Sequence, residues 1–250
     1  MESLEVLGYV ALGASAGLLV GCAGIGGVVL VPALVYVAGY PLPVAIAAAM
    51  CAFIVSGLVG SYAYWKSGAI RWRLALPLWL GALPCAFGGA VLVDSVPAAF
   101  LELAIGLLTL GSGLHALVIR RERTDGGRTL PARFLAGVGA VTGLVSALTG
   151  TGGPLVLVPI LLALDVPMLA SIGLAQAIQL PIAAAATGGF LLSGLLDVPL
   201  ALALAAGIAL GTWLGAQAAH AFPTSRLRRL VAVLLVIVGC AMLLRLAANA

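Results

Sequence analysis

The sequence predicts an all-α, polytopic membrane protein built from two inverted repeats, each with a glycine-broken re-entrant hairpin and three transmembrane helices. Three observations predict this fold: long apolar stretches without charge, a glycine and proline pattern that recurs half a chain later, and basic residues gathered in three short loops. Of the 250 residues, 63% are hydrophobic and 8% are charged, whereas a soluble domain carries about 25% charged residues.

The uncharged stretches are long enough to cross a bilayer several times. Residues 6–65, 134–164 and 166–196 contain no Asp, Glu, Lys or Arg, and one crossing needs about 20 apolar residues. The runs lack the period-2 alternation of a membrane β-barrel, so we expect helices. The net charge of +4 comes from short loops, which indicates membrane orientation and not binding to nucleic acid.

The second half of the chain repeats the first at a constant offset of 126 residues, as from Gly17 to Gly143. Identities at one offset, with glycine and proline prominent among them, indicate an internal duplication. The superposed pairs include Gly17 with Gly143, Gly24 with Gly150, Gly26 with Gly152, Gly27 with Gly153, and Pro41 with Pro167.

We expect residues 1–119 to form repeat one and 133–250 to form repeat two, with a polar cytoplasmic linker at 120–132. Within each repeat, Pro, Gly, Asp and Ser mark the breaks between apolar segments. The expected segments are a hairpin at 6–40 and spans at 43–65, 72–94 and 97–119, then a hairpin at 133–165 and spans at 168–193, 198–221 and 226–247.

The basic loops explain why two segments should turn back. Residues 66–73, 120–133 and 226–229 should all face the cytoplasm. Three full crossings between the last two loops would put residues 226–229 outside. One of the three segments must therefore return to the side of the membrane from which it entered. The segment 133–165 would be about 50 Å long as a helix, against a hydrocarbon core of about 30 Å. We therefore expect it to form two short arms that meet near the midplane.

The same argument applied to 6–40 places both termini outside a bacterial-type cytoplasmic membrane. Each repeat then has three spans, and because three is odd, one repeat is inverted relative to the other, as in many secondary transporters. The alternative is eight full spans in parallel repeats, with residues 226–229 outside.

Each expected hairpin is broken by Gly-x-Gly-Gly, which points to an anion site. Glycine allows tight turning and close backbone approach. A helix that starts at the break presents free N–H groups and its positive dipole end, which bind anions without a charged side chain. The alternative is that the glycines only allow close helix packing. The candidate residues are Gly24, Ile25, Gly26, Gly27 and Val28 at the first break, and Thr149, Gly150, Thr151, Gly152 and Gly153 at the second.

Polar residues near the second break extend this candidate site. The Thr149 and Thr151 hydroxyls either donate to a substrate or bond back to their own helix. Gln176 and Gln179 are three residues apart and share a helix face, where they either line the substrate pathway or join helices. Their counterparts in the first half are Met50 and Phe53, so the site would be asymmetric.

The remaining titratable candidates are Glu102 and His115, which could couple transport to protons or lie at the membrane interface. The coupling ion would be a proton or sodium. The sequence has no catalytic motif, phosphate-binding loop or metal-ligand cluster, so we expect no enzyme activity, cofactor or metal. A homo-oligomer is compatible with the sequence.

The two-copy pattern of Gly, six residues, Gly-x-Gly-Gly and a proline five or six residues later resembles the sulfite exporter TauE/SafE family. The turns at Ser67-Gly68 and Ser193-Gly194 also resemble that family, and the resemblance covers about residues 7–246. It implies an inner-membrane permease for sulfite, sulfonates or related small organic anions. This chain departs from the family by having Val28 and Pro154 where members often carry a third glycine.

The sequence therefore predicts a secondary transporter, in the export direction, for small anions held between two hairpin tips. One alternative is a passive anion channel. The other is a membrane-embedded enzyme or assembly factor that uses its thiols, which belong to Cys22, Cys51, Cys85 and Cys240.

Overall fold

The computed structural model describes residues 3–23, 27–118, 130–221 and 224–248. These residues form helices and no strand, which confirms the all-α class. The elements are α1 (Ser3–Ala23), α2 (Gly27–Tyr36), α3 (Leu42–Lys66), α4 (Trp72–Leu92), the 3-10 helix η1 (Val93–Ser95), α5 (Ala98–Val118), α6 (Ala132–Thr149), α7 (Pro154–Ala163), α8 (Met168–Leu192), α9 (Val198–Ala221) and α10 (Thr224–Ala248).

Among the described residues, six helices are long and apolar enough to cross a membrane: α3, α4 with η1, α5, α6, α8 and α9. A multi-pass membrane protein is therefore confirmed. The set differs from the expected spans at two helices. α6, expected as a short hairpin arm, has 18 residues and qualifies. α10 does not qualify, because its described apolar part, Ala232–Ala248, is shorter.

Both glycine-broken segments consist of a long helix followed by a short one. α1 and α6 have 21 and 18 residues, whereas α2 and α7 have 10 each. At 1.5 Å per residue, α6 is about 27 Å long and α7 about 15 Å. The expectation of two short arms in each hairpin is therefore wrong. The apolar run before each break is long enough to span most of the hydrocarbon core by itself.

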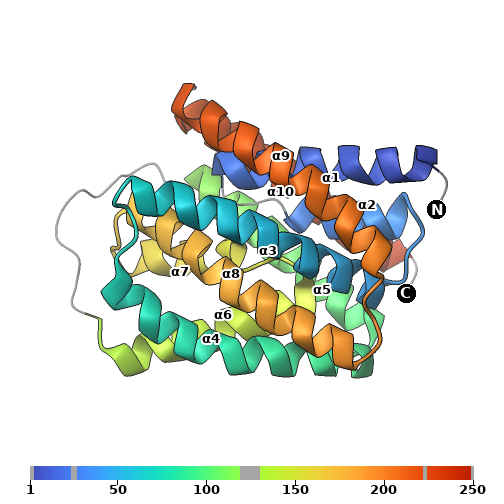
Figure 1. Cartoon of the computed structure of the whole chain (residues 1–250), viewed down its shortest axis with the longest axis horizontal. Coiled ribbons are helices and arrows are strands. Elements are labelled where there is room, and N and C mark those ends of the chain that lie inside the picture. The colour runs from blue at the N-terminus through green and yellow to red at the C-terminus, as the bar shows by residue number, and fades with distance from the viewer. Residues whose placement is uncertain (1–2, 24–26, 119–129, 222–223, 249–250) are drawn as a thin grey trace.

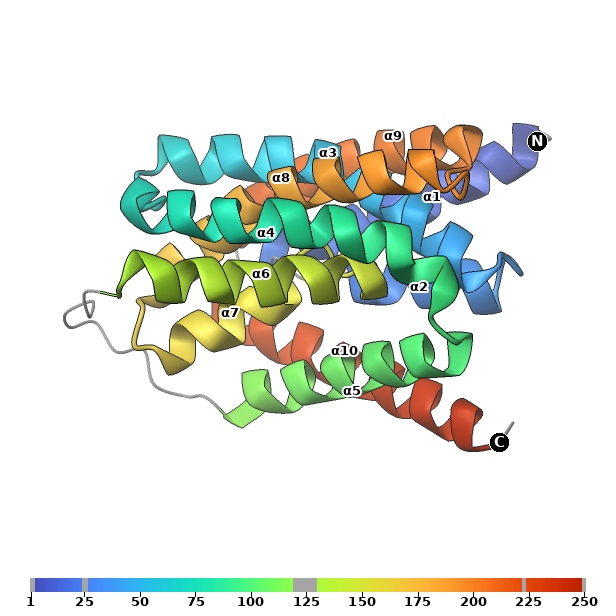
Figure 2. The same cartoon turned by 90° about the horizontal axis from the view of Figure 1, so that it is seen from below.

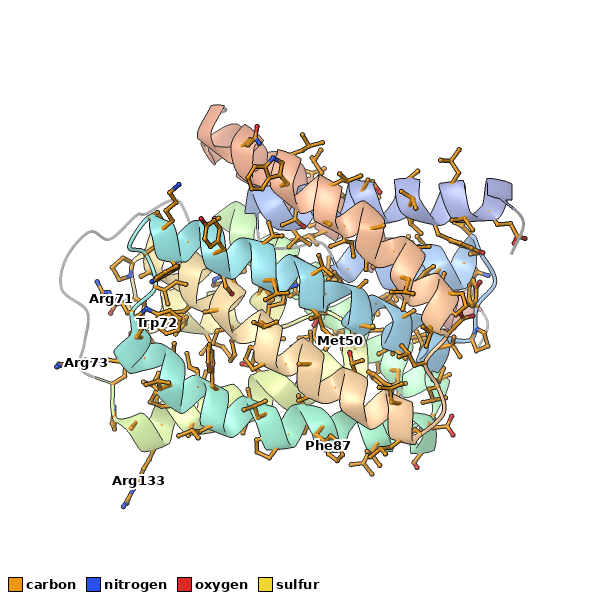
Figure 3. All side chains as sticks on the ribbon, in the orientation of Figure 1. Met50, Arg71, Trp72, Arg73, Phe87 and Arg133 are labelled. Carbon is orange, nitrogen blue, oxygen red and sulfur yellow. The ribbon has the colours of Figure 1, made fainter. Side chains whose placement is uncertain are left out.

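The chain begins and ends at the same end of the helix bundle (Figures 1 and 2). Figure 2 shows α1 starting at that end and α6 starting at the opposite one. Arg71, Arg73 and Arg133 also lie at the end opposite the termini (Figure 3). The inversion of the repeats, their boundaries and the side that each end faces stay predictions, and this arrangement supports them.

Helices from the two halves pack on each other in two matching pairs, α1 with α9 and α4 with α6. A methyl group at Gly17 would lie 2.6 Å from the Ile208 carbonyl oxygen. One at Gly143 would overlap the Ala82 carbonyl oxygen. Ile208 and Ala82 are related by the same offset as the two glycines. The glycine contacts therefore follow the sequence repeat, and small residues let these backbones approach closely.

α3 and α8 are the most buried of the candidate spans and pack directly on each other. α5 packs on α10, and this pair lies along one side of the bundle (Figure 2). Large apolar side chains remain exposed on the outer faces of the bundle, including Leu80, Leu192 and Leu244, each more than 70% exposed. Such a surface is costly in water but suits contact with lipid tails.

Candidate functional site

The second break, residues 149–155, is a tight turn that only glycine readily forms, and we call it the second tip. Gly150 ends α6 with φ of 66°, and Gly152 and Gly153 follow with φ of 77° and 109°. The Gly150 N–H closes α6 by donating to the Ser146 carbonyl at 2.9 Å. L-residues with a side chain pay for positive φ, so the backbone conformation itself requires all three glycines.

α7 begins at this tip and directs its N-terminus into the protein. The Gly153 carbonyl accepts hydrogen bonds from the N–H groups of Val156, at 3.1 Å, and Leu157, at 3.0 Å. Pro154 occupies the first turn and has no N–H to satisfy. No described residue accepts a hydrogen bond from the N–H groups of Gly152, Gly153 or Leu155. These unpaired donors and the helix dipole favour an anion at this position.

The second tip is enclosed by neighbouring helices. All residues from 149 to 157 are buried. A Cβ added to Gly150 would meet Val31 of α2 at 2.7 Å, and one added to Gly152 would meet Phe53 of α3 at 3.1 Å and Gln179 of α8 at 3.3 Å. Elements from both halves of the chain therefore surround this turn.

The two threonines of the second tip use their hydroxyl protons within the protein. Thr149 Oγ1 donates to the Val145 carbonyl at 2.7 Å. Thr149 Oγ1 and Thr151 Oγ1 are 3.0 Å apart, so the Thr151 hydroxyl donates to that of Thr149. Of the two, Thr149 bonds back to its own helix, whereas Thr151 bonds to the Thr149 side chain.

Gln176 joins helices. Its Nε2 donates to the Val20 carbonyl of α1 at 3.4 Å. Its Oε1 lies 2.6 Å from the position of a Cβ on Gly60 of α3, and the Ser61 hydroxyl donates to its backbone carbonyl at 3.1 Å. Both glutamines are buried as expected, and Gln176 Oε1 also has no hydrogen-bond partner among the described residues.

Gln179 borders the second tip. Its Nε2 lies 3.3 Å from the position of a Cβ on Gly152 and 3.5 Å from the Ser56 hydroxyl. Its Oε1 is buried and has no hydrogen-bond partner among the described residues. Because buried polar groups are normally paired, this amide has bonding capacity left for another molecule.

Sequence reasoning missed Ser146 as a site residue. Its hydroxyl is fully buried, has no partner among the described residues, and lies 4.0 Å from the position of a Cβ on Gly153. A signal was available, because the offset pairs Ser146 with Val20. A hydroxyl that replaces an apolar residue one turn before the break adds a polar group to the second tip alone.

Part of the first break lies outside the described residues, including Gly24, Ile25 and Gly26. Gly27 starts α2, and Val28 is buried. Val28 forms one apolar cluster with Leu155 of α7 and Leu235 of α10. The N-terminal turns of the two short arms therefore lie close to each other.

Glu102 and His115 both lie on α5, and no described contact joins either one to the second tip. Glu102 is close enough to Tyr36 to interact electrostatically with its hydroxyl, and Arg245 Cζ lies 4.2 Å from the centre of the Tyr36 ring. His115 Nε2 is buried without a partner among the described residues. The two residues are about 20 Å apart along the helix, so they cannot exchange a proton directly.

Among the described residues, no group of three or more His, Cys, Asp or Glu side chains could hold a metal ion. Cys51, Cys85 and Cys240 are free thiols within helices. Nothing in this part of the chain brings two of these thiols together.

Comparison with known proteins now identifies the relatives of this chain. The sequence model of the sulfite exporter TauE/SafE family matches residues 9–242. A Bacillus subtilis protein named "Probable membrane transporter protein YdhB" is 25% identical over 214 residues, which cover 83% of this chain and 87% of its own length. A Methanocaldococcus jannaschii protein named "Probable membrane transporter protein MJ0441" is 26% identical over 250 residues and 91% of each chain. No solved structure matches the chain.

Proposed function

Because this chain belongs to the sulfite exporter TauE/SafE family, a family of membrane transporters, we propose that it exports small anions across the cytoplasmic membrane as a secondary transporter. The proposed substrates are sulfite, sulfonates and other small organosulfur or organic anions. The observation that carries the proposal is the N-terminus of α7, where the N–H groups of Gly152, Gly153 and Leu155 are buried without described partners. Unpaired buried donors favour a bound anion.

In this proposal the anion lies between the two tips. The amides of the second tip bind it from one side, with the Ser146 hydroxyl and the Gln179 amide beside them. The first break, Gly24 to Val28, is the predicted source of the opposing amides, although Gly24, Ile25 and Gly26 lie outside the described residues. The cluster of Val28 with Leu155 supports this placement, because it brings the two short arms together.

The burial of residues 149–157 favours a carrier over a passive channel. A channel needs a continuous path in its conducting state, whereas a carrier passes through a state in which the site is closed. Alternating access would arise from movement of one repeat relative to the other. Protons or sodium would supply the driving force, with Glu102 and His115 as candidate proton acceptors.

Flux measurements in proteoliposomes test the proposal. We expect sulfite and sulfonate flux in the native protein, and its loss in Gly152→Leu and Gly26→Leu. Gly137→Leu is a matched control, because Gly137 lies in α6 with no atom within 4 Å of its Cβ position. Unchanged flux in folded Gly152→Leu protein would refute the site. A proton or sodium gradient should drive concentrative flux, whereas single-channel currents would favour the channel.

A further inference from the structure

The space in front of the second tip is limited by one aromatic ring. Phe53 lies in α3 and is completely buried. Its Cδ2 and Cε2 atoms lie 3.1 and 3.6 Å from the position of a Cβ on Gly152. A phenyl ring is rigid and buries a large area, so it fixes how far any group bound at Gly152 can extend towards α3.

Two buried polar side chains, independent of the helix N-terminus, indicate that a ligand binds here. Ser146 Oγ and Gln179 Oε1 have no hydrogen-bond partner among the described residues, although both side chains are at least 98% buried. They approach Gly153 and Gly152 from α6 and α8. Buried polar atoms are normally paired, and a molecule at the tip would satisfy both.

Phe53 and Gln179 are equivalent positions of the sequence repeat, at the same offset as Gly17 and Gly143. They meet at Gly152, where one half of the chain supplies an amide and the other a phenyl ring. A phenyl ring carries no N–H or O–H group, so it offers an anion no hydrogen bond. The substrate therefore meets polar groups on the α8 side and a steric limit on the α3 side.

We propose that Phe53 is a specificity-determining residue that sets the maximum size of the transported anion. This inference rests on the proposed function and adds a steric limit to it. The phenyl ring occupies the volume into which an organic substituent of the anion would extend. We expect the ring to leave room for sulfite and methanesulfonate in the state that admits substrate, and to exclude longer alkanesulfonates.

The test compares flux of sulfite and of alkanesulfonates from methanesulfonate to butanesulfonate in proteoliposomes. In the native protein we expect flux to fall with chain length. In Phe53→Ala we expect the butanesulfonate to methanesulfonate flux ratio to rise about tenfold or more, since each methylene in a fitted pocket is worth about 10-fold or more. Phe53→Leu should give a smaller rise and serves if the alanine variant does not fold.

Phe190→Ala is the matched control, because Phe190 is also completely buried but lies further along α8, about 16 Å from Gln179. It should lose comparable stability and keep the native flux ratio. An unchanged ratio in both Phe53 variants, or an equal rise in Phe190→Ala, overturns the role of Phe53 while leaving anion transport intact. Absence of flux for sulfite and for every sulfonate in the native protein overturns the proposed function and this inference together.

Discussion

Replacing Gly152 by alanine tests most directly whether the backbone of the second tip binds the substrate. Gly152 has φ of 77°, and an L-residue in this left-handed region pays about 1–2 kcal/mol. The new methyl group would lie 3.1 Å from Phe53 Cδ2 and 3.3 Å from Gln179 Nε2. Both contacts are tighter than normal packing, and overpacking costs typically about 1–3 kcal/mol.

Gly194→Ala separates backbone strain from the site. Gly194 has φ of 68°, lies between α8 and α9, and has no atom within 4 Å of its Cβ position. Both variants should share the strain, so Gly152→Ala should be less stable than Gly194→Ala by about 1–3 kcal/mol. Thermal unfolding in detergent, followed by tryptophan fluorescence, measures this difference.

Flux then decides the functional question. Displacing the amides of the second tip should lower anion flux in Gly152→Ala by about tenfold or more, because each 1.4 kcal/mol of lost binding is about tenfold in affinity. Gly194→Ala should keep native flux despite its strain. If folded Gly152→Ala protein transports sulfite as fast as Gly194→Ala, the backbone of the second tip does not bind the substrate.

Three further outcomes are expected. Gly139→Ala should destabilise the protein by about 2 kcal/mol or more, because its methyl group would overlap the Leu78 carbonyl oxygen. Gly137→Ala is the control, because no atom lies within 4 Å of its Cβ position, and its unfolding temperature should equal that of the native protein. Gln176→Leu should cost about 1 kcal/mol or less of stability and keep native anion flux, whereas Gln179→Leu should lose flux. Loss of flux in Gln176→Leu with native flux in Gln179→Leu would instead make Gln176 the residue that contacts the substrate. A hydrogen bond with Tyr9, together with burial, raises the pKa of Tyr40 from 10.0 to about 12. The stabilisation of the folded state by this hydrogen bond is complete below pH 10.0 and disappears as pH rises towards about 12. Ultraviolet titration of Tyr9→Phe should show the pKa of Tyr40 moving back towards its ordinary value.

The helices were predictable because a bilayer imposes a simple length and polarity requirement. The expected span 43–65 corresponds to α3 at Leu42–Lys66, and the expected span 198–221 has the bounds of α9. Proline and glycine at the loops fixed these ends locally. The unequal arms at the glycine breaks were not predicted, because a break shows where a helix ends but not how the parts divide the membrane thickness.

The candidate site was predictable only where its chemistry is local. Positive φ at Gly150, Gly152 and Gly153 follows from a compact glycine turn, and the sequence indicated it. Phe53 as a neighbour of Gly152 could not be deduced, because that contact depends on how α3 packs beside α7 and α8. The different surroundings of Gln176 and Gln179 have the same origin, since helical spacing puts both on one face but does not say which neighbour each meets.

In the proposed site, the two halves of the chain contribute different side chains at equivalent positions. Ser146 and Gln179 replace Val20 and Phe53 of the first half, so buried polar groups gather at the second tip. A second polar set in the first half would add more buried groups that need partners, and each unpaired group costs about 1–3 kcal/mol. In our proposal the first half instead contributes the Phe53 ring, which limits the site without needing a hydrogen bond. The double variant Phe53→Gln with Gln179→Phe should therefore move the polar contact from α8 to α3 and not create a second site. The stoichiometry of sulfite binding distinguishes one site from two.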